Sequence, residues 1–210
     1  MQEPIIHNDS NEKIIRDLIK QYLIEQYNSQ IFEEFTHFSL NTRNDVMGIS
    51  EQYNLIISVE IKSDRDTLKR LINQVNEYKL YSDIVLVVVD KKHLKNIIKL
   101  QIARELDDVG IMVYSSVSNS LSTIQHHKVL PNPLGMFEYL WSHELMMFLK
   151  YSKNRSKIAK NINNLQRVIL KHYEPGEIKQ ISNLIFIHRD GFNKSANYPS
   201  VDVLCKKLIL

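Results

Sequence analysis

The side chains best suited to chemistry lie at the end of an apolar run, Asn54 to Val59. There Glu60 and Lys62 place a carboxylate and an ammonium two positions apart, and Asp45 lies upstream of them. Because side chains alternate between the two faces of a strand, a strand would turn Glu60 and Lys62 to the same side. Such a set suits metal-dependent phosphodiester hydrolysis. The alternative is a solvated surface pair, because Glu-x-Lys triplets are common.

The chemistry predicted for this set follows from its atoms. Asp45 and Glu60 offer hard carboxylate oxygens for one or two Mg²⁺ or Mn²⁺ ions, and the backbone carbonyl of Ile61 would complete the shell. Lys62 would position or activate a water and stabilise the transition state. We therefore expect Asp45, Glu60 and Ile61 to be metal ligands.

A second polar pair follows on the next expected helix. Gln74 and Tyr78 lie four residues apart, so they share a helix face with Arg70. They could orient Lys62 or contact a substrate phosphate. The alternative is an ordinary exposed polar face.

These motifs resemble a known family. Asp45 followed by Glu60-x-Lys62 resembles the PD-(D/E)XK nuclease motif, and the Gln-x-x-x-Tyr spacing resembles that of RecB-type nucleases. The run EIKSDRDTLKRL, which begins at Glu60, is similar to a family of small uncharacterised bacterial and phage proteins of this type. The similarity extends from about Phe32 to about Leu149. One departure is Asn44, which stands where the motif has proline.

The resemblance implies a Mg²⁺-dependent hydrolase, an endonuclease-like enzyme acting on DNA. Its catalytic residues would be Asp45, Glu60, Lys62, Gln74 and Tyr78. RNA is not excluded as substrate, because nothing in the motif reads a 2′-hydroxyl. The rival hypothesis is a non-catalytic module, phage-encoded or defence-related, that keeps the fold to bind nucleic acid or a protein. Many nucleases of this superfamily dimerise, so a homodimer is also possible.

Two further acids and one basic cluster are weaker candidates. Glu12 or Glu34 could face the metal site, although Glu12 also suits the positive end of a helix. Besides Arg70, the expected contacts to nucleic-acid phosphates are Lys153, Arg155 and Lys157. An ordinary solvated surface would explain that cluster equally well.

Composition bounds the class of protein. A chain of 210 residues with 43% hydrophobic and 24% charged residues is typical of a globular protein with one sizeable core. The net charge of +3 is compatible with nucleic-acid binding without requiring it. A single Cys205 excludes an internal disulfide and favours a reducing cytoplasm. We see no signal peptide and no apolar run long enough to cross a membrane.

Hydrophobic periodicity predicts an α/β fold, a restriction-endonuclease-like core with a central mixed sheet flanked by helices. We expect the core at residues 1–130 and a helical C-terminal region, packed on it, at 131–210. Expected strands are 32–40, 45–49, 55–61, 84–89 and 111–114, with another strand or hairpin near 117–124. Expected helices are 12–27, 64–81, 94–106, 137–151, 155–172, 177–188 and, less clearly, 201–210.

Overall fold

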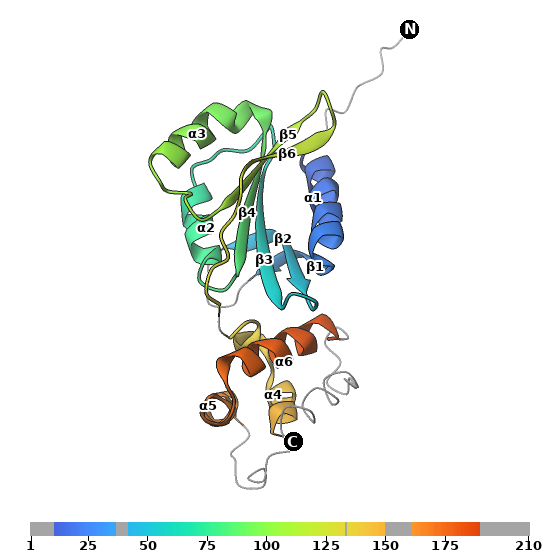
Figure 1. The fold of residues 1–210 in the computed structure, drawn as a ribbon, viewed down its shortest axis with the longest axis vertical. Coiled ribbons are helices and arrows are strands. Elements are labelled where there is room, and N and C mark those ends of the chain that lie inside the picture. Colours follow the sequence, from blue (N-terminus) through green and yellow to red (C-terminus); the bar gives the residue numbers. More distant parts are fainter. Residues whose placement is uncertain (1–10, 37–41, 133, 150–160, 190–210) are drawn as a thin grey trace. The chain divides into compact units, whose positions relative to one another are not determined.

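Helices and strands alternate through Gln125, after which the described chain is mainly helical (Figure 1). The computed structural model describes residues 11–36, 42–132, 134–149 and 161–189. Its strands are β1 (Ser29–Thr36), β2 (Arg43–Ser50), β3 (Leu55–Lys62), β4 (Ile84–Asp90), β5 (Gly110–Ser115) and β6 (Ser120–Gln125). Its helices are α1 (Glu12–Tyr27), α2 (Leu71–Tyr78), η1 (Lys91–His93), α3 (Leu94–Ile102), η2 (Phe137–Tyr139), α4 (Ser142–Phe148), α5 (Ile162–His172) and α6 (Pro175–Ile187).

The strands of the described residues form one mixed sheet in the order β1-β2-β3-β4-β5-β6. Strands β3, β4 and β5 are parallel, and β6 returns antiparallel to β5. Only a short turn joins β2 to β3, which is the connection of an antiparallel hairpin, whereas α2 and α3 provide the crossovers that parallel strands need. The prediction of an α/β fold with a mixed sheet, flanking helices and C-terminal helices is confirmed.

The register between β3 and β4 decides which way the candidate site faces. Glu60 pairs with Val87 and Lys62 with Val89. Residues paired across neighbouring strands point to the same face of a sheet, so the acid and the lysine share the face of those valines. Val87 and Val89 belong to a buried cluster that also contains Leu71 of α2. Glu60 and Lys62 therefore lie on the face that α2 covers.

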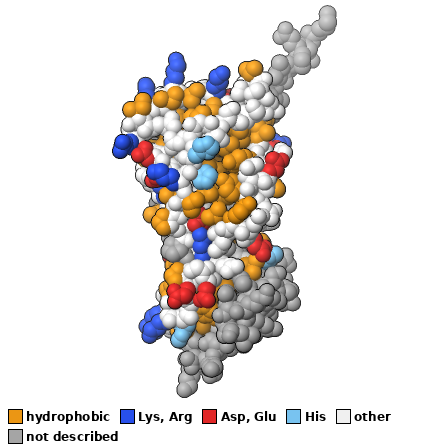
Figure 2. Space-filling view, in the orientation of Figure 1, with side chains coloured by type: hydrophobic (Ala, Val, Ile, Leu, Met, Phe, Trp, Pro, Cys, Tyr) orange, Lys and Arg blue, Asp and Glu red, His pale blue; other side chains and the backbone are white. Residues whose placement is uncertain are grey.

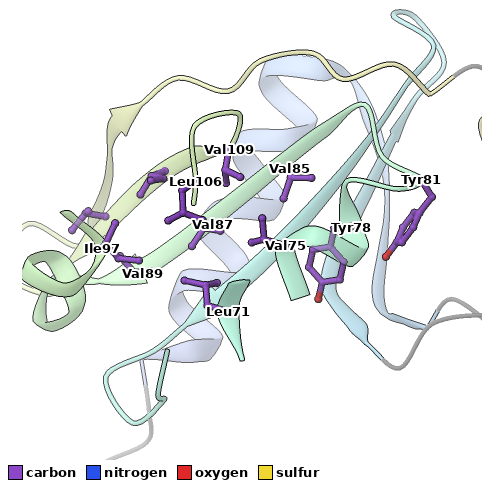
Figure 3. Packing of buried hydrophobic residues seen from close by; sticks show 12 residues of the cluster. Leu71, Val75, Tyr78, Tyr81, Val85, Val87, Val89, Ile97, Leu106 and Val109 are labelled. Atoms are coloured by element: carbon purple, nitrogen blue, oxygen red, sulfur yellow. The ribbon is translucent and has the colours of Figure 1, made fainter. Parts of the chain in front are cut away.

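Helices α2 and α3 close this face with an apolar core. Leu71 and Val75 of α2 are fully buried, and Ile97 anchors α3 in the same cluster. Figure 3 shows the side chains of α2 and the valines of β4 packed in one layer. Leu68 and Ile72 are partly buried beside this cluster.

Helix α1 lies on the opposite face of the sheet from α2 and α3 (Figure 1). Its buried residues Ile15, Ile19 and Leu23 recur at helical spacing, as the sequence predicted. A Cβ atom at Gly48 of β2 would lie 3.2 Å from Leu23 Cδ1, so the missing side chain lets the helix approach closely.

The segment before α2 differs from its prediction. We expected a helix from Asp64, but α2 begins at Leu71. Asp66 Oδ2 accepts hydrogen bonds from the backbone N–H of Ser63, at 2.8 Å, and from its hydroxyl, at 2.6 Å. These bonds close a turn where the helix was expected, because short polar side chains compete for backbone groups. Residues 63–70 are called the site turn below.

The C-terminal helices form a second apolar cluster. Helices α4, α5 and α6 bury Phe148, Leu165, Ile169 and Ile181 together. Residues 49–56, the tip of the β2–β3 hairpin, group with residues 131–210 into one compact unit, while 1–48 and 57–130 form the other. The expected helix at 201–210 lies outside the described residues. No helix among the described residues is long and apolar enough to span a membrane.

Candidate active site

The Glu60 carboxylate is the centre of a buried hydrogen-bond network. Its Oε1 accepts from Lys62 Nζ at 2.5 Å and from Gln74 Nε2 at 2.5 Å. Gln74 Oε1 accepts in turn from Lys62 Nζ at 3.1 Å, so the three side chains form a closed triangle. Glu60 is 1% exposed and Lys62 5% exposed. A carboxylate so deeply buried requires such partners, because removing it from water is otherwise very costly.

Tyr78 contacts the other oxygen of the same carboxylate. Its hydroxyl lies 2.5 Å from Glu60 Oε2 and 2.8 Å from the backbone carbonyl oxygen of Arg43. It has one proton, so it donates to one of these acceptors at a time. Burial, followed by the charge of Glu60, raises the pKa of Tyr78 well above its usual range. The hydroxyl therefore stays protonated and acts as a donor.

Asp45 approaches from β2 and joins this network through the backbone. Its Oδ2 accepts from the Ile61 N–H at 2.7 Å, between the two motif residues of β3. Burial, and then repulsion from Glu60, raise the pKa of the Asp45 carboxyl to about 7, although the Ile61 N–H and the Lys62 charge oppose this. The two carboxylates repel each other, and the nearby cations Lys62 and Arg16 oppose the resulting rise in pKa without cancelling it. A further cation would relieve this repulsion.

A cavity of about 570 Å³ opens over these groups. Asp45, Glu60, Ile61, Lys62 and Gln74 all contribute to its wall. The remaining lining side chains are mostly charged or polar: Glu12, Thr42, Arg43, Asp66, Arg70, Asn73 and Glu77. A small polar group such as a phosphodiester could therefore reach both acids and the lysine.

A match to a known family accompanies this geometry. A family model described as bacteriophage P4 protein cII matches residues 3–194. The chain belongs to the bacteriophage P4 protein cII family. That description names a phage protein and no activity. The phage association that we expected is therefore shown, while the chemistry of this family member has to be argued from its site.

The other comparisons add little to this assignment. Among solved structures, a protein of unknown function from Silicibacter pomeroyi matches with a TM-score of 0.41 and 16% sequence identity, over 57% of this chain and 71% of that one. So weak a likeness carries no argument. No curated protein matches the chain.

The donor atoms of this P4 cII family member suit a hard divalent ion in part. Asp45 and Glu60 supply carboxylate oxygens at the cavity wall, and Ile61 also contributes to that wall. Both oxygens of Glu60 already accept hydrogen bonds, so an ion would share or displace those donors. The described residues hold no cluster of three or more His, Cys, Asp or Glu side chains arranged for a metal. Carbonyl oxygen and water would thus have to complete the shell.

The two additional acids occupy different places. Glu12 lines the cavity, as expected, but its Oε1 accepts from Arg16 at 2.7 Å. Glu34 does not line the cavity. It pairs with Arg16 at 2.8 Å and with Arg43 at 2.7 Å. Its φ of 54° lies in the left-handed region, which is strained for a residue with a side chain.

Among the expected phosphate contacts, Arg70 lines the cavity and is exposed. Lys153, Arg155 and Lys157 lie outside the described residues. Sequence reasoning missed Arg16, whose Nη1 donates to the backbone carbonyl of Asp45 at 2.6 Å. The spacing of Glu12 and Arg16, one helical turn apart, was the available signal.

Sequence reasoning also missed the role of Asp66 in holding the site turn. It stands three residues after Ser63, the usual spacing for a side chain that caps a turn, and this signal was legible. His93, at the end of η1, contacts the same turn. Its Nε2 donates to the Ser63 carbonyl oxygen at 2.9 Å, so the same turn is fixed from both sides.

Proposed function

We propose that this P4 cII family member is a metal-dependent nuclease that hydrolyses phosphodiester bonds in DNA. The observation that carries the proposal is the convergence of Asp45, Glu60 and Lys62 at one polar cavity. The three residues come from two strands, and they match the resemblance to PD-(D/E)XK nucleases by position. A chain that only needed a stable fold would gain nothing from a buried acid and a half-buried one in mutual repulsion.

The residues have separable tasks under this proposal. Asp45, Glu60 and the Ile61 carbonyl would hold Mg²⁺ or Mn²⁺. A bound ion would polarise the phosphate and lower the pKa of a water. Lys62 would place its ammonium against the charge that develops on the phosphate oxygens, in a site where little water screens the interaction.

Gln74 and Tyr78 act on those groups. Gln74 holds the Lys62 ammonium and the Glu60 carboxylate in one plane of hydrogen bonds, at 3.1 and 2.5 Å. Tyr78 fixes the second oxygen of Glu60. Because their own contacts are to Glu60 and Lys62, both are positioning residues.

One observation favours the rival hypothesis of a non-catalytic binding module. Every oxygen of Glu60 has a protein donor, so the acid is satisfied without an ion. In that case the buried network would be structural, and the cavity would bind phosphate without cleaving it. A homodimer and a cytoplasmic location are compatible with either hypothesis.

The test combines cleavage with ion binding. Purified chain is incubated with plasmid, linear duplex, single-stranded DNA and RNA in Mg²⁺ or Mn²⁺, and EDTA should abolish cleavage. Calorimetric titration with Mn²⁺ should show binding that Asp45→Asn weakens. Lys62→Ala should lose cleavage. Its control is Lys13→Ala, which removes an exposed cation from α1 and should cleave like the wild type. If the wild type neither cleaves any substrate nor binds Mn²⁺, the nuclease proposal fails and the binding module takes its place.

A further inference from the structure

A basic surface lies beside the candidate active site. It comprises exposed cations of the site turn and of the segment that begins with η1, and we call it the turn–α3 surface: Arg65, Lys69, Arg70, Lys92, Lys95 and Lys99. None of these cations forms an ion pair with another residue in the part of the chain that the structure describes. Figure 2 shows several Lys and Arg side chains around the position of α3, with hydrophobic and a few acidic side chains among them. Unpaired cations grouped in this way attract polyanions.

The sheet places both halves of this surface at the carboxyl ends of its parallel strands. The site turn follows β3 and the η1–α3 segment follows β4, and these strands are parallel. Lys62 is in register with Val89, so both strands end at the same level. The surface therefore lies directly beyond the strand ends that carry Glu60 and Lys62.

A second cavity, of about 510 Å³, lies within the surface. Lys92 of η1 and Asn96 and Lys99 of α3 line it together with Asp66 and Thr67 of the site turn. Leu68, His93 and Leu100 complete a wall that is largely apolar. Two ammonium groups, an amide and a hydroxyl at its rim are donors that phosphate oxygens accept from, while the Asp66 carboxylate is held by Ser63.

The site turn connects the two cavities. Asp66 contributes to both walls, while Arg70 lines the first cavity. The turn is also held in place, because Asp66 bonds Ser63 and the His93 imidazole bonds the Ser63 carbonyl. Binding here would consequently require little ordering of the backbone.

The acids at this edge are already engaged by protein donors. Asp66 accepts from Ser63, and Asp64 Oδ1 accepts from the Asn11 N–H at 3.1 Å. Asp90 Oδ1 accepts from the Lys92 N–H at 2.8 Å, and its Oδ2 accepts from Asn11 Nδ2 at 2.9 Å. The surface cations thus remain available to an external anion.

We propose that the turn–α3 surface binds the phosphodiester backbone of DNA and leads it into the candidate active site. The second cavity receives a phosphate of the same strand on the far side of the site turn. This inference rests on the proposed function, because it assigns the substrate path of that site. It adds a binding site at residues that play no part in the chemistry.

The experiment measures binding without cleavage. Anisotropy of a fluorescein-labelled duplex DNA of arbitrary sequence is recorded in EDTA over a series of salt concentrations, for the wild type and for Lys92→Gln/Lys99→Gln. Losing two phosphate contacts should weaken binding regardless of sequence and lower the slope of log affinity against log salt by about two. Single-stranded DNA and duplex RNA of the same sequence show which form of backbone fits best.

The matched control removes two exposed cations elsewhere, in Arg167→Gln/Lys171→Gln on α5. Its salt slope should stay at the wild-type value. An equal loss in both double variants would mean attraction to net charge alone and would overturn the inference, as would a wild type that binds no nucleic acid. Binding that depends on Lys92 and Lys99, in a chain that cleaves nothing, would support the surface and sink the nuclease proposal. If the wild type cleaves DNA and the Lys92→Gln/Lys99→Gln variant binds DNA as the wild type does, the nuclease proposal is supported and the proposed role of the turn–α3 surface is wrong.

Discussion

Two buried acid–cation pairs in this chain make a useful comparison. Glu144 of α4 is completely buried and pairs with Arg189, just after α6, while Glu60 pairs with Lys62 on β3. Both acids are buried, and both have their oxygens filled by donors. They differ in the charged groups that lie nearby and in whether a cavity borders them.

The Glu144 pair is matched in charge and geometry. Arg189 Nε donates to Oε1 at 2.9 Å and Nη2 to Oε2 at 2.7 Å, the two-pronged arrangement that suits a guanidinium. The guanidinium carbon lies 4.6 Å from the Trp141 ring centre and 4.5 Å from that of Phe186. Oε2 also accepts from the Trp141 N–H, which caps α4. Among the described residues one acid meets one cation here, an arrangement that serves the fold.

The Glu60 pair has a second acid beside it, Asp45, whose pKa is raised by burial and by repulsion from Glu60, although Lys62 and Arg16 oppose that rise. It also borders a cavity. A structural ion pair balances its charges, whereas a site for chemistry keeps an imbalance that a ligand can relieve. Burial alone therefore does not separate the two roles, but the count of charges and the access to a cavity do.

The largest expected effect is on the matched pair. Arg189→Ala leaves Glu144 buried without its cation, so the free energy of unfolding should fall by roughly 3–5 kcal/mol. Urea unfolding followed by circular dichroism measures this, with Arg167→Ala on α5 as an exposed control. At a temperature where the variant is folded, its cleavage rate should equal that of the wild type. A variant that lost cleavage while fully folded would show that the Glu144–Arg189 pair serves more than the fold.

Lys62→Ala should show the opposite pattern. It removes the cation that faces the transition state, so cleavage should fall on the order of 10²–10³-fold. Mn²⁺ binding should persist in calorimetry, because lysine is not a ligand of the ion. Retained cleavage would place the chemistry elsewhere in the chain.

Gln74→Ala should have an intermediate effect, because Gln74 orients Lys62 and Glu60 without touching substrate. We expect cleavage to fall roughly tenfold through kcat, with KM little changed, and stability to fall by about 1 kcal/mol for the lost hydrogen bonds. Kinetics of Gln74→Asn beside Gln74→Ala test this positioning role. If the role of Gln74 were purely structural, the folded fraction of each variant would have the kcat of the wild type.

A further expected effect is on the pH dependence of stability. The Asp45 carboxyl has its folded pKa raised to about 7 from an ordinary value of 3.8, so the folded state binds more protons between these values. Without divalent ions, the unfolding free energy should decrease as pH rises from about 4 to about 7. Asp45→Asn should flatten that part of the curve in thermal unfolding at constant ionic strength. A wild-type contribution that grew with pH in this range would contradict the raised pKa.

The sequence predicted those parts of the site that depend on local periodicity. The parity of Glu60 and Lys62, and the four-residue spacing of Gln74 and Tyr78, each correspond to a contact in the structure. The short connection between β2 and β3 brings Asp45 beside β3. These predictions succeeded because strand and helix periods fix which side chains share a face.

The remaining features depend on partners distant in sequence. Arg16 of α1 reaches the backbone of β2, and His93 holds Ser63 across the sheet edge. The spacing of Glu12 and Arg16 places both on one helix face, but it does not predict the contact of Arg16 with β2, and no spacing predicts the contact of His93. The late start of α2 arose from a side chain competing for the backbone of Ser63, which propensity alone does not weigh.

The strand order of the sheet also bears on synthesis at the ribosome. Each strand in the sequence β1 to β6 is a spatial neighbour of the one before it, so every new strand can add to a finished edge as it emerges. The residues of the candidate active site, from Asp45 to Tyr78, emerge before β4 and β5. Until β4 arrives, the edge of β3 offers unpaired backbone groups to other chains. A delay between the emergence of β3 and that of β4 from the ribosome would lengthen that exposure, so the aggregation of nascent chains should depend on the speed of translation in this interval.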